Sequence, residues 1–139
     1  MTEHTSNKPV YEANGEPMGF RVLPDEGKGP ALEISERQMG TFLGHEVTNL
    51  VTYRMTPTPD GTMKGEGQGI ATLKDGSMTF WTGKGEGKQT GPEGPTNWNV
   101  TIMFRNPTGK FAEFKDRPLT GSYVVDAAWK SKGSLFAKP

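Results

Sequence analysis

The residues of this sequence whose types and spacing could do chemistry are a carboxylate and an amide placed among aromatic side chains. The stretch from Lys64 to Lys88, "KGEGQGIATLKDGSMTFWTGKGEGK", has glycine at alternate positions on both sides of an Asp-Gly pair. If each Asp-Gly pair of the region forms a two-residue hairpin turn, Glu66 and Gln68 share one face of a sheet with Tyr53 and Trp81. Apolar surroundings disfavour the charged form of a carboxylate and raise its pKa toward the range useful for proton transfer.

These side chains predict a site inside a β-structure. The candidate residues are Glu66 as catalytic acid or base and Tyr53, Gln68, Trp81 and Trp98 as substrate-binding residues. The alternative is that Glu66 lies near a solvated mouth, paired with Lys64, because structural ion pairs also perturb carboxylates. Aromatic walls beside a polar pair equally suit the binding of a small apolar ligand.

Other kinds of site find little support in the sequence. Cysteine is absent, which excludes a thiol nucleophile, a disulfide and a thiolate zinc site. The strings "GKGEGK" and "GEGQGIA" lack the spacing of a phosphate loop or a dinucleotide fingerprint. The two histidines, His4 and His45, show no metal-ligand spacing, and no G-x-S-x-G elbow is present. We therefore expect neither a metal nor a cofactor.

Charge and length limit the partners of the protein. The 139 residues carry 16 Lys plus Arg and 16 Asp plus Glu, so the formal net charge is zero. This removes the simplest electrostatic argument for a nucleic-acid or anionic-membrane partner. The polar start has no signal-peptide core, and no apolar run is long enough to cross a bilayer. We expect a cytoplasmic protein.

The elements that must position the site are antiparallel strands. Apolar and polar residues alternate with period two in residues 31–37, 47–56, 97–104 and 119–129, and short turns separate these segments. A meander of this length tends to close and so to remove its edges. We predict an all-β fold, a small antiparallel up-and-down barrel of about eight strands, with a β-sandwich as the alternative. We expect residues 1–17 to form a flexible tail and residues 18–139 a single barrel domain.

The glycines predict how the barrel interior is filled. Gly83, Gly85 and Gly87 leave room for large side chains from the strand at residues 97–104. The interior face is expected to collect Val51, Tyr53, Met55, Glu66, Gln68, Ile70, Trp81, Gly83, Gly85 and Gly87. The same register sends Ala71, Leu73, Met78 and Phe80 outward as an apolar patch. Monomers seldom expose large patches, so we expect a homo-oligomer.

Two stretches resemble a known group of proteins. The stretch "GTFLGHEVTNLVTYRMTPTPDGTMKGEGQGIATLKDGSMTFWTGKGEGK" and the end "GKFAEFKDRPLTGSYVVDAAWKSKGSLF" are similar to bacterial proteins of unknown function that have allene-oxide-cyclase-like barrels. The likeness extends from about Gly40 to Phe136. It implies the barrel fold and an interior that holds an apolar substrate, assisted in some members by a buried acid. The catalytic residues of those proteins have no position-by-position match here, so none is carried over, and fold does not fix function.

Three functions remain open from the sequence. The first is a module that binds a small apolar or aromatic molecule in the barrel. The second is a cofactor-free isomerase or cyclase that uses Glu66. The third is a structural or oligomerisation barrel with a solid core.

Overall fold

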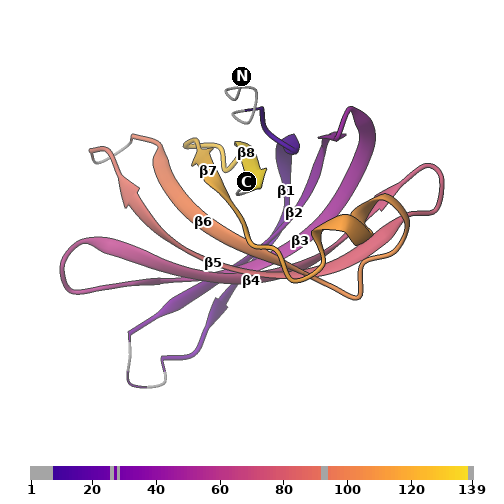
Figure 1. Cartoon of the computed structure of the whole chain (residues 1–139). Coiled ribbons are helices and arrows are strands. Elements are labelled where there is room, and N and C mark those ends of the chain that lie inside the picture. Colours follow the sequence, from indigo (N-terminus) through magenta and orange to yellow (C-terminus); the bar gives the residue numbers. More distant parts are fainter. Residues whose placement is uncertain (1–7, 26, 28, 92–93, 138–139) are drawn as a thin grey trace.

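Eight antiparallel strands, each bonded to the next in sequence, form a closed barrel because the last strand pairs back onto the first (Figure 1). The computed structural model describes residues 8–25, 27, 29–91 and 94–137. The strands are β1 (Tyr11–Leu23), β2 (Ala31–Phe42), β3 (His45–Pro57), β4 (Thr62–Leu73), β5 (Met78–Gln89), β6 (Thr96–Arg105), β7 (Leu119–Val125) and β8 (Ser131–Ala137). The predicted all-β, antiparallel up-and-down barrel is confirmed, and the sandwich alternative is wrong.

Side chains alternate between the interior and the outer surface along the strands, and a bulge between Pro17 and Gly19 interrupts the alternation on β1. On β6, Trp98, Ile102 and Phe104 are buried, while Asn97 and Asn99 are exposed. Adjacent strands place the glycines of β5 opposite these large residues: Gly83 pairs with Ile102, and Gly87 with Trp98. The prediction that glycines on one strand make room for large side chains on the next is therefore confirmed.

The predicted register of β4 is wrong by one residue. Both Asp-Gly turns are three-residue loops. A backbone hydrogen bond joins Thr58 to Thr62 around Asp60-Gly61, and another joins Leu73 to Ser77 around Asp75-Gly76. Gly61 and Gly76 take positive φ in these loops, at 89° and 92°, as the bulge position of such a turn requires.

The extra residue in each loop reverses the two faces of β4 and leaves β5 unchanged, because the second shift cancels the first. Gly65, Gly67 and Gly69 therefore face inward, while Glu66, Gln68 and Ile70 face outward and are exposed.

The barrel begins earlier in the chain than predicted. β1 starts at Tyr11, so residues 11–17, expected to belong to a flexible tail, are part of the sheet; residues 1–7 lie outside the described residues. The inward residues Tyr11, Ala13 and Gly15 alternate with polar ones. Alanine and glycine give this alternation little hydrophobic contrast, which explains why it was missed.

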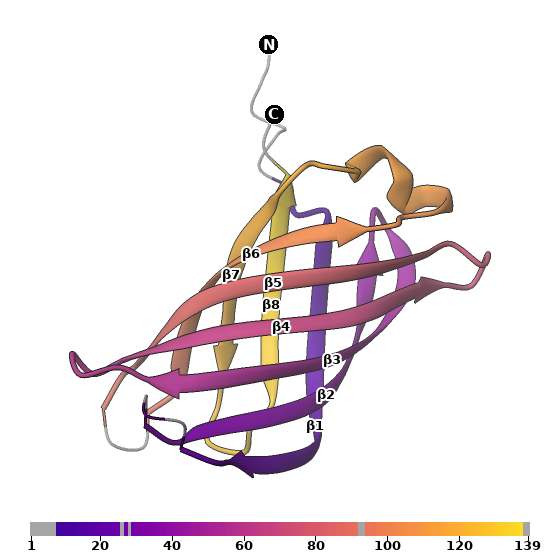
Figure 2. The ribbon, with the colours of Figure 1, turned by 90° about the horizontal axis from the view of Figure 1, so that it is seen from below.

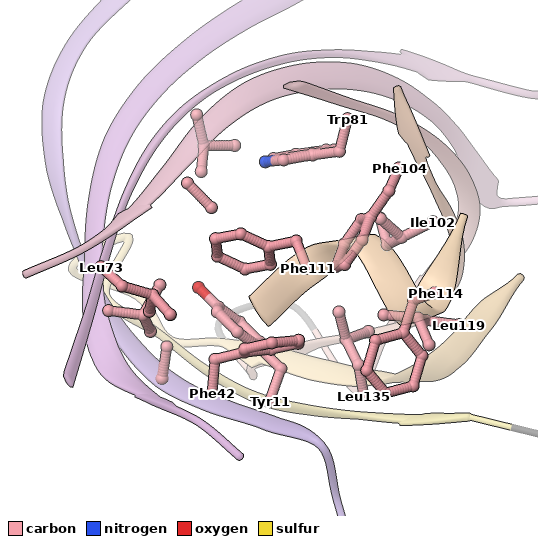
Figure 3. Close-up of a cluster of buried hydrophobic side chains, with 14 residues drawn as sticks. Tyr11, Phe42, Leu73, Trp81, Ile102, Phe104, Phe111, Phe114, Leu119 and Leu135 are labelled. Atoms are coloured by element: carbon pink, nitrogen blue, oxygen red, sulfur yellow. The ribbon is translucent and has the colours of Figure 1, made fainter. Parts of the chain in front are cut away.

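A short 3-10 helix, η2 (Gly109–Phe114), lies across one end of the barrel (Figure 2). Its Phe111 projects among the interior side chains and is 4.5 Å from Phe42 and 5.5 Å from Phe104, measured between ring centroids (Figure 3). Phe114 is buried beside them. This aromatic cluster fills the end of the barrel that η2 covers.

The apolar residues of the outer surface also differ from the prediction. Ala71 and Leu73 were expected outside, but they are buried in the interior because β4 is shifted. Leu50, Ile70 and Phe80 instead lie side by side on three neighbouring strands, and they are 51%, 39% and 45% exposed. We call these three residues the outer apolar row. In the described part of the chain, no helix has the length and hydropathy needed to span a membrane.

Candidate ligand site in the barrel interior

The barrel interior contains a cavity of about 110 Å³ that is partly open to solvent. The buried or partly buried polar side chains that line it include Tyr11, Glu36, Gln38, Asn49, Tyr123 and Ser131, and the exposed residues Glu66 and Lys84 also border it. The aromatic and aliphatic side chains that line it include Val51, Tyr53, Trp81, Trp98, Val100, Ile102, Phe104 and Phe111. The site is thus apolar on most sides with one group of polar residues, a composition typical of small-molecule pockets.

The polar residues form a continuous chain of hydrogen bonds. Trp81 Nε1 donates to Asn49 Oδ1 at 2.8 Å. Asn49 Nδ2 donates to the Tyr11 hydroxyl at 3.1 Å, and that hydroxyl donates to Gln38 Oε1 at 2.6 Å. Gln38 Nε2 then donates to Glu36 Oε2 at 2.6 Å. The chain therefore connects the indole of β5 to a carboxyl group on β2.

The indole of Trp81 fixes the direction of these bonds. An indole nitrogen can only donate, so the oxygen of the Asn49 amide must face it, and the Asn49 NH₂ must face Tyr11. Tyr11 then gives its own proton to Gln38, whose NH₂ group is turned toward Glu36. Every bond points the same way, and the Glu36 carboxylate is the final acceptor.

A glycine on β1 lets a second donor reach the same carboxyl group. Ser131 Oγ on β8 donates to Glu36 Oε1 on β2 at 2.9 Å, across the intervening strand β1. Gly15 lies between them, and a Cβ there would be 2.6 Å from Glu36 Oε1. Any side chain at position 15 would block this bond, so both oxygens of Glu36 have a donor only because residue 15 is glycine.

Burial dominates the electrostatics of the site. Glu36 is 5% exposed, and this desolvation raises its pKa, although the hydrogen bonds from Gln38 and Ser131 act in the opposite direction. Burial likewise raises the pKa values of the Tyr11, Tyr53 and Tyr123 hydroxyls, and the negative charge of Glu36 adds to each effect. These phenols remain neutral donors at physiological pH.

Glycines on β4 and β5 make room for the aromatic wall. A Cβ at Gly69 would lie 2.5 Å from the Trp81 indole, and a Cβ at Gly65 or Gly87 would lie 2.8 Å from that of Trp98. Trp98 also meets Tyr53 edge to face, with ring centroids 6.2 Å apart. The alternating glycines noted in the sequence are therefore the surfaces against which two indoles rest.

The predicted site residues separate into two groups. Tyr53, Trp81 and Trp98 line the cavity together, as expected. Glu66 and Gln68 do not join them, because the register of β4 turns both side chains to the outer surface. Glu66 still borders the cavity between the inward-facing Gly65 and Gly67, whereas Gln68 does not border it. The predicted interior position of the catalytic candidate Glu66 is therefore wrong, and the carboxyl group in the cavity is Glu36.

Sequence reasoning missed the polar residues of β2 and β3, although a signal for β2 was present. Leu32 and Ile34 were identified as one face of a strand, and the same alternation continues through Glu36 and Gln38 to Phe42. The apolar face was followed only as far as Ile34, because the next inward position, Glu36, is charged and charged residues usually interrupt a buried face. The described residues contain no cluster of three or more histidine or acidic side chains suited to holding a metal ion.

Comparisons with known proteins agree on the fold and do not identify an activity. No protein-family model matches the chain, and no curated protein matches it. A conserved protein of unknown function from Rhodopseudomonas palustris has a similar structure, with a TM-score of 0.77 and 11% identity over 94% of this chain and 95% of that one. A protein of unknown function from Clostridium acetobutylicum has a TM-score of 0.76 and 12% identity over 95% and 98% of the two chains. At these identities the likeness establishes a shared barrel fold.

Proposed function

We propose that the protein binds a small molecule with an apolar body inside its barrel. The observation that carries this proposal is the cavity of about 110 Å³, with a hydrogen-bonded polar group on one side and aromatic rings on the others. Interiors of native proteins are close-packed, so a void of this size needs a reason. It also disfavours the third function, a barrel with a solid core.

The size of the cavity limits the ligand. An engineered cavity of about 150 Å³ in another protein accepts benzene. A ligand enclosed here is therefore about as large as a five- or six-membered ring, and a longer molecule would extend from the cavity. Tyr53, Trp98 and Val100 would contact its apolar part.

Cyclopentanol is a suitable probe because it combines a small apolar ring with one hydroxyl group. Trp81 and Trp98 line the cavity, so binding should change tryptophan fluorescence, whereas Trp129 lies outside the lining and gives a constant background. A chemical-shift titration provides an independent measurement. In Val100→Phe a larger side chain fills part of the cavity, and affinity should fall; Val124→Phe, on the outer face of β7, is the matched control. Equal binding by both variants would contradict a site in the interior.

A cofactor-free proton-transfer catalyst is the second candidate function. Glu36 favours it, because a carboxylate whose pKa is raised by burial is a stronger base than an exposed one, and this one lines the cavity. The resemblance of the glycine-rich hairpin to allene-oxide-cyclase-like barrels supports the same alternative.

Cyclopentanone tests this second candidate. Glu36 would take a proton from the carbon next to the carbonyl group and leave an enolate. After this proton exchanges with the deuterated solvent, Glu36 would return a deuteron to the same carbon. In deuterated water the protein should then speed the exchange of these protons, as followed by NMR. Glu36→Gln should remove the acceleration, and Glu66→Gln, on the outer face, should retain it. No acceleration by the wild-type protein would exclude this chemistry for small ketones.

A further inference from the structure

The cavity is lined by one buried acidic side chain, Glu36. Glu66 and Lys84 also border the cavity, but both are exposed, and they lie opposite each other on β4 and β5. Glu36 is the single charged residue among the buried residues of the described chain. The ion pairs of Glu16, Glu33, Glu46 and Asp75 all lie at the surface, and Glu36 has no cationic partner in the part of the chain that the structure describes. An unpaired buried charge is costly, and an opposite charge beside it offsets that cost.

The hydrogen bonds around Glu36 are those of an acceptor. Oε1 accepts from Ser131 and Oε2 accepts from Gln38, whose orientation is fixed through Tyr11 and Asn49 by Trp81. An ionised carboxyl oxygen can accept more than one hydrogen bond, so each oxygen retains acceptor capacity. Glu36 lines the cavity, where a ligand can use that capacity.

The remaining walls also suit a positive charge. Trp98 and Tyr53 meet edge to face in the lining of the cavity, and Trp81 is a third aromatic residue there. The electron-rich faces of these rings attract cations. A negatively charged ligand would instead be repelled by Glu36, and none of the buried side chains in the described chain carries the positive charge that would offset this repulsion.

We propose, on the premise that the cavity is a ligand site, that its ligand is a small organic cation. A primary or secondary ammonium group donates hydrogen bonds to the Glu36 carboxylate, and the apolar part of the molecule lies against Tyr53, Trp98 and Val100. This deepens the proposed function by naming the chemical class of the ligand.

Three probes with the same ring test the proposal: cyclopentylammonium, neutral cyclopentanol and anionic cyclopentanecarboxylate. Their affinities are measured by tryptophan fluorescence and by chemical-shift titration near neutral pH and at matched ionic strength. The cation should bind about tenfold or more tightly than the alcohol, the gain typical of a hydrogen bond to a charged group. The carboxylate should bind most weakly.

Glu36→Gln should abolish the preference for the cation, because the new amide keeps the shape of the side chain and removes its charge. Glu66→Gln makes the same chemical change on the outer face and should keep the preference. If the interior variant does not fold, the wild-type protein still decides the matter through pH. Affinity for cyclopentylammonium should rise with pH as Glu36 ionises, while affinity for cyclopentanol should not. The other titratable groups facing Glu36 are Tyr11, Tyr53 and Tyr123. Their raised pKa values keep them neutral over the pH range in which Glu36 ionises.

The outcomes distinguish the cation proposal from the proposal of a ligand site. Equal or tighter binding of cyclopentanol would overturn the cation proposal and leave the cavity as a site for neutral molecules. Binding of none of the three probes would overturn the ligand site itself. A cation preference that survives Glu36→Gln would show that another group provides it and would overturn the role given to Glu36.

Discussion

Trp81 on β5 donates its indole proton to Asn49 on β3 at 2.8 Å, and this bond sets the direction of every later bond in the interior network. The two residues are not on adjacent strands, because β4 lies between them. The indole reaches across β4 at Gly69, where a Cβ would lie 2.5 Å from the ring. The network therefore requires glycine at position 69 as well as the side chains that form the hydrogen bonds.

Asn49→Ala should destabilise the protein. The substitution leaves the buried Trp81 Nε1–H without its acceptor and removes the donor to the Tyr11 hydroxyl. A buried polar group left unsatisfied costs about 1–3 kcal/mol, which urea unfolding would measure. Asn97→Ala on the exposed face of β6 is the matched control and should have little effect. Equal losses for the two variants would mean that the network adds nothing to stability.

Gly69→Ala should also be destabilising, for a steric reason. Its Cβ would lie 2.5 Å from both the Trp81 indole and the backbone oxygen of Leu50. Overpacking of this kind typically costs about 1–3 kcal/mol. Gly19→Ala is the control, since a Cβ there meets nothing within 4 Å. The free energies of unfolding of the two variants give the comparison, and a Gly69→Ala protein as stable as the Gly19→Ala protein would refute the steric argument.

The stability of the ligand-free protein should depend on pH through Glu36. Its pKa is raised in the folded state. At low pH Glu36 is protonated in both the folded and the unfolded state, so its burial as a charge does not lower the stability. As the pH rises through the ordinary range of glutamate, the unfolded state ionises first and the folded state loses relative stability. Each unit by which the pKa is raised corresponds to about 1.4 kcal/mol.

Glu36→Gln should therefore become more stable relative to the wild type as the pH rises above about 4, the ordinary pKa range of glutamate. Denaturant unfolding at several pH values measures the difference. Glu66→Gln controls for removal of a carboxylate from an exposed position. A difference between Glu36→Gln and the wild type that does not change with pH would contradict the assignment of a raised pKa to Glu36.

Self-association through the outer apolar row of Leu50, Ile70 and Phe80 remains a prediction. If a second copy covers this row, Phe80→Lys should shift the mass measured by light scattering toward that of a monomer, because a buried lysine would have no partner. Val22→Lys changes an exposed residue on β1, away from the row, and should leave the mass unaltered. A monomeric wild-type protein would end the proposal.

Strand alternation and turn residues predicted the barrel and most of its interior, while loop length determined where the prediction failed. The inward positions of Val51, Tyr53, Trp81 and Trp98 follow from period two alone. An Asp-Gly pair fits a loop of two or three residues equally well, and the choice reverses a whole strand. That single ambiguity placed Glu66 inside.

Glu36 could have been found from the sequence by continuing the alternation of Leu32 and Ile34 along the same strand. The same alternation also reaches its partner Gln38, but not the partners on other strands. The contact of Ser131 with Glu36 spans β1 and depends on the closure of the barrel. The bond from Trp81 to Asn49 spans β4 and depends on the correct register of three consecutive strands. Such contacts between distant segments are visible only in the folded structure.

The seam between β1 and β8 has a consequence for the order in which the chain folds. It pairs Tyr11–Gly15 with Leu135–Ser131, segments near opposite ends of the chain, whereas every other pair of neighbouring strands is joined by a local connection. Bringing such distant segments together carries the largest loop-closure entropy, so the seam should form after the hairpins and set the folding rate. Ser131 reaches Glu36 only across this seam. The hydrogen bond from Ser131 to Glu36 should thus form in the last folding step. The backbone amide protons of the β1–β8 seam should be among the first to exchange with solvent when the barrel opens locally.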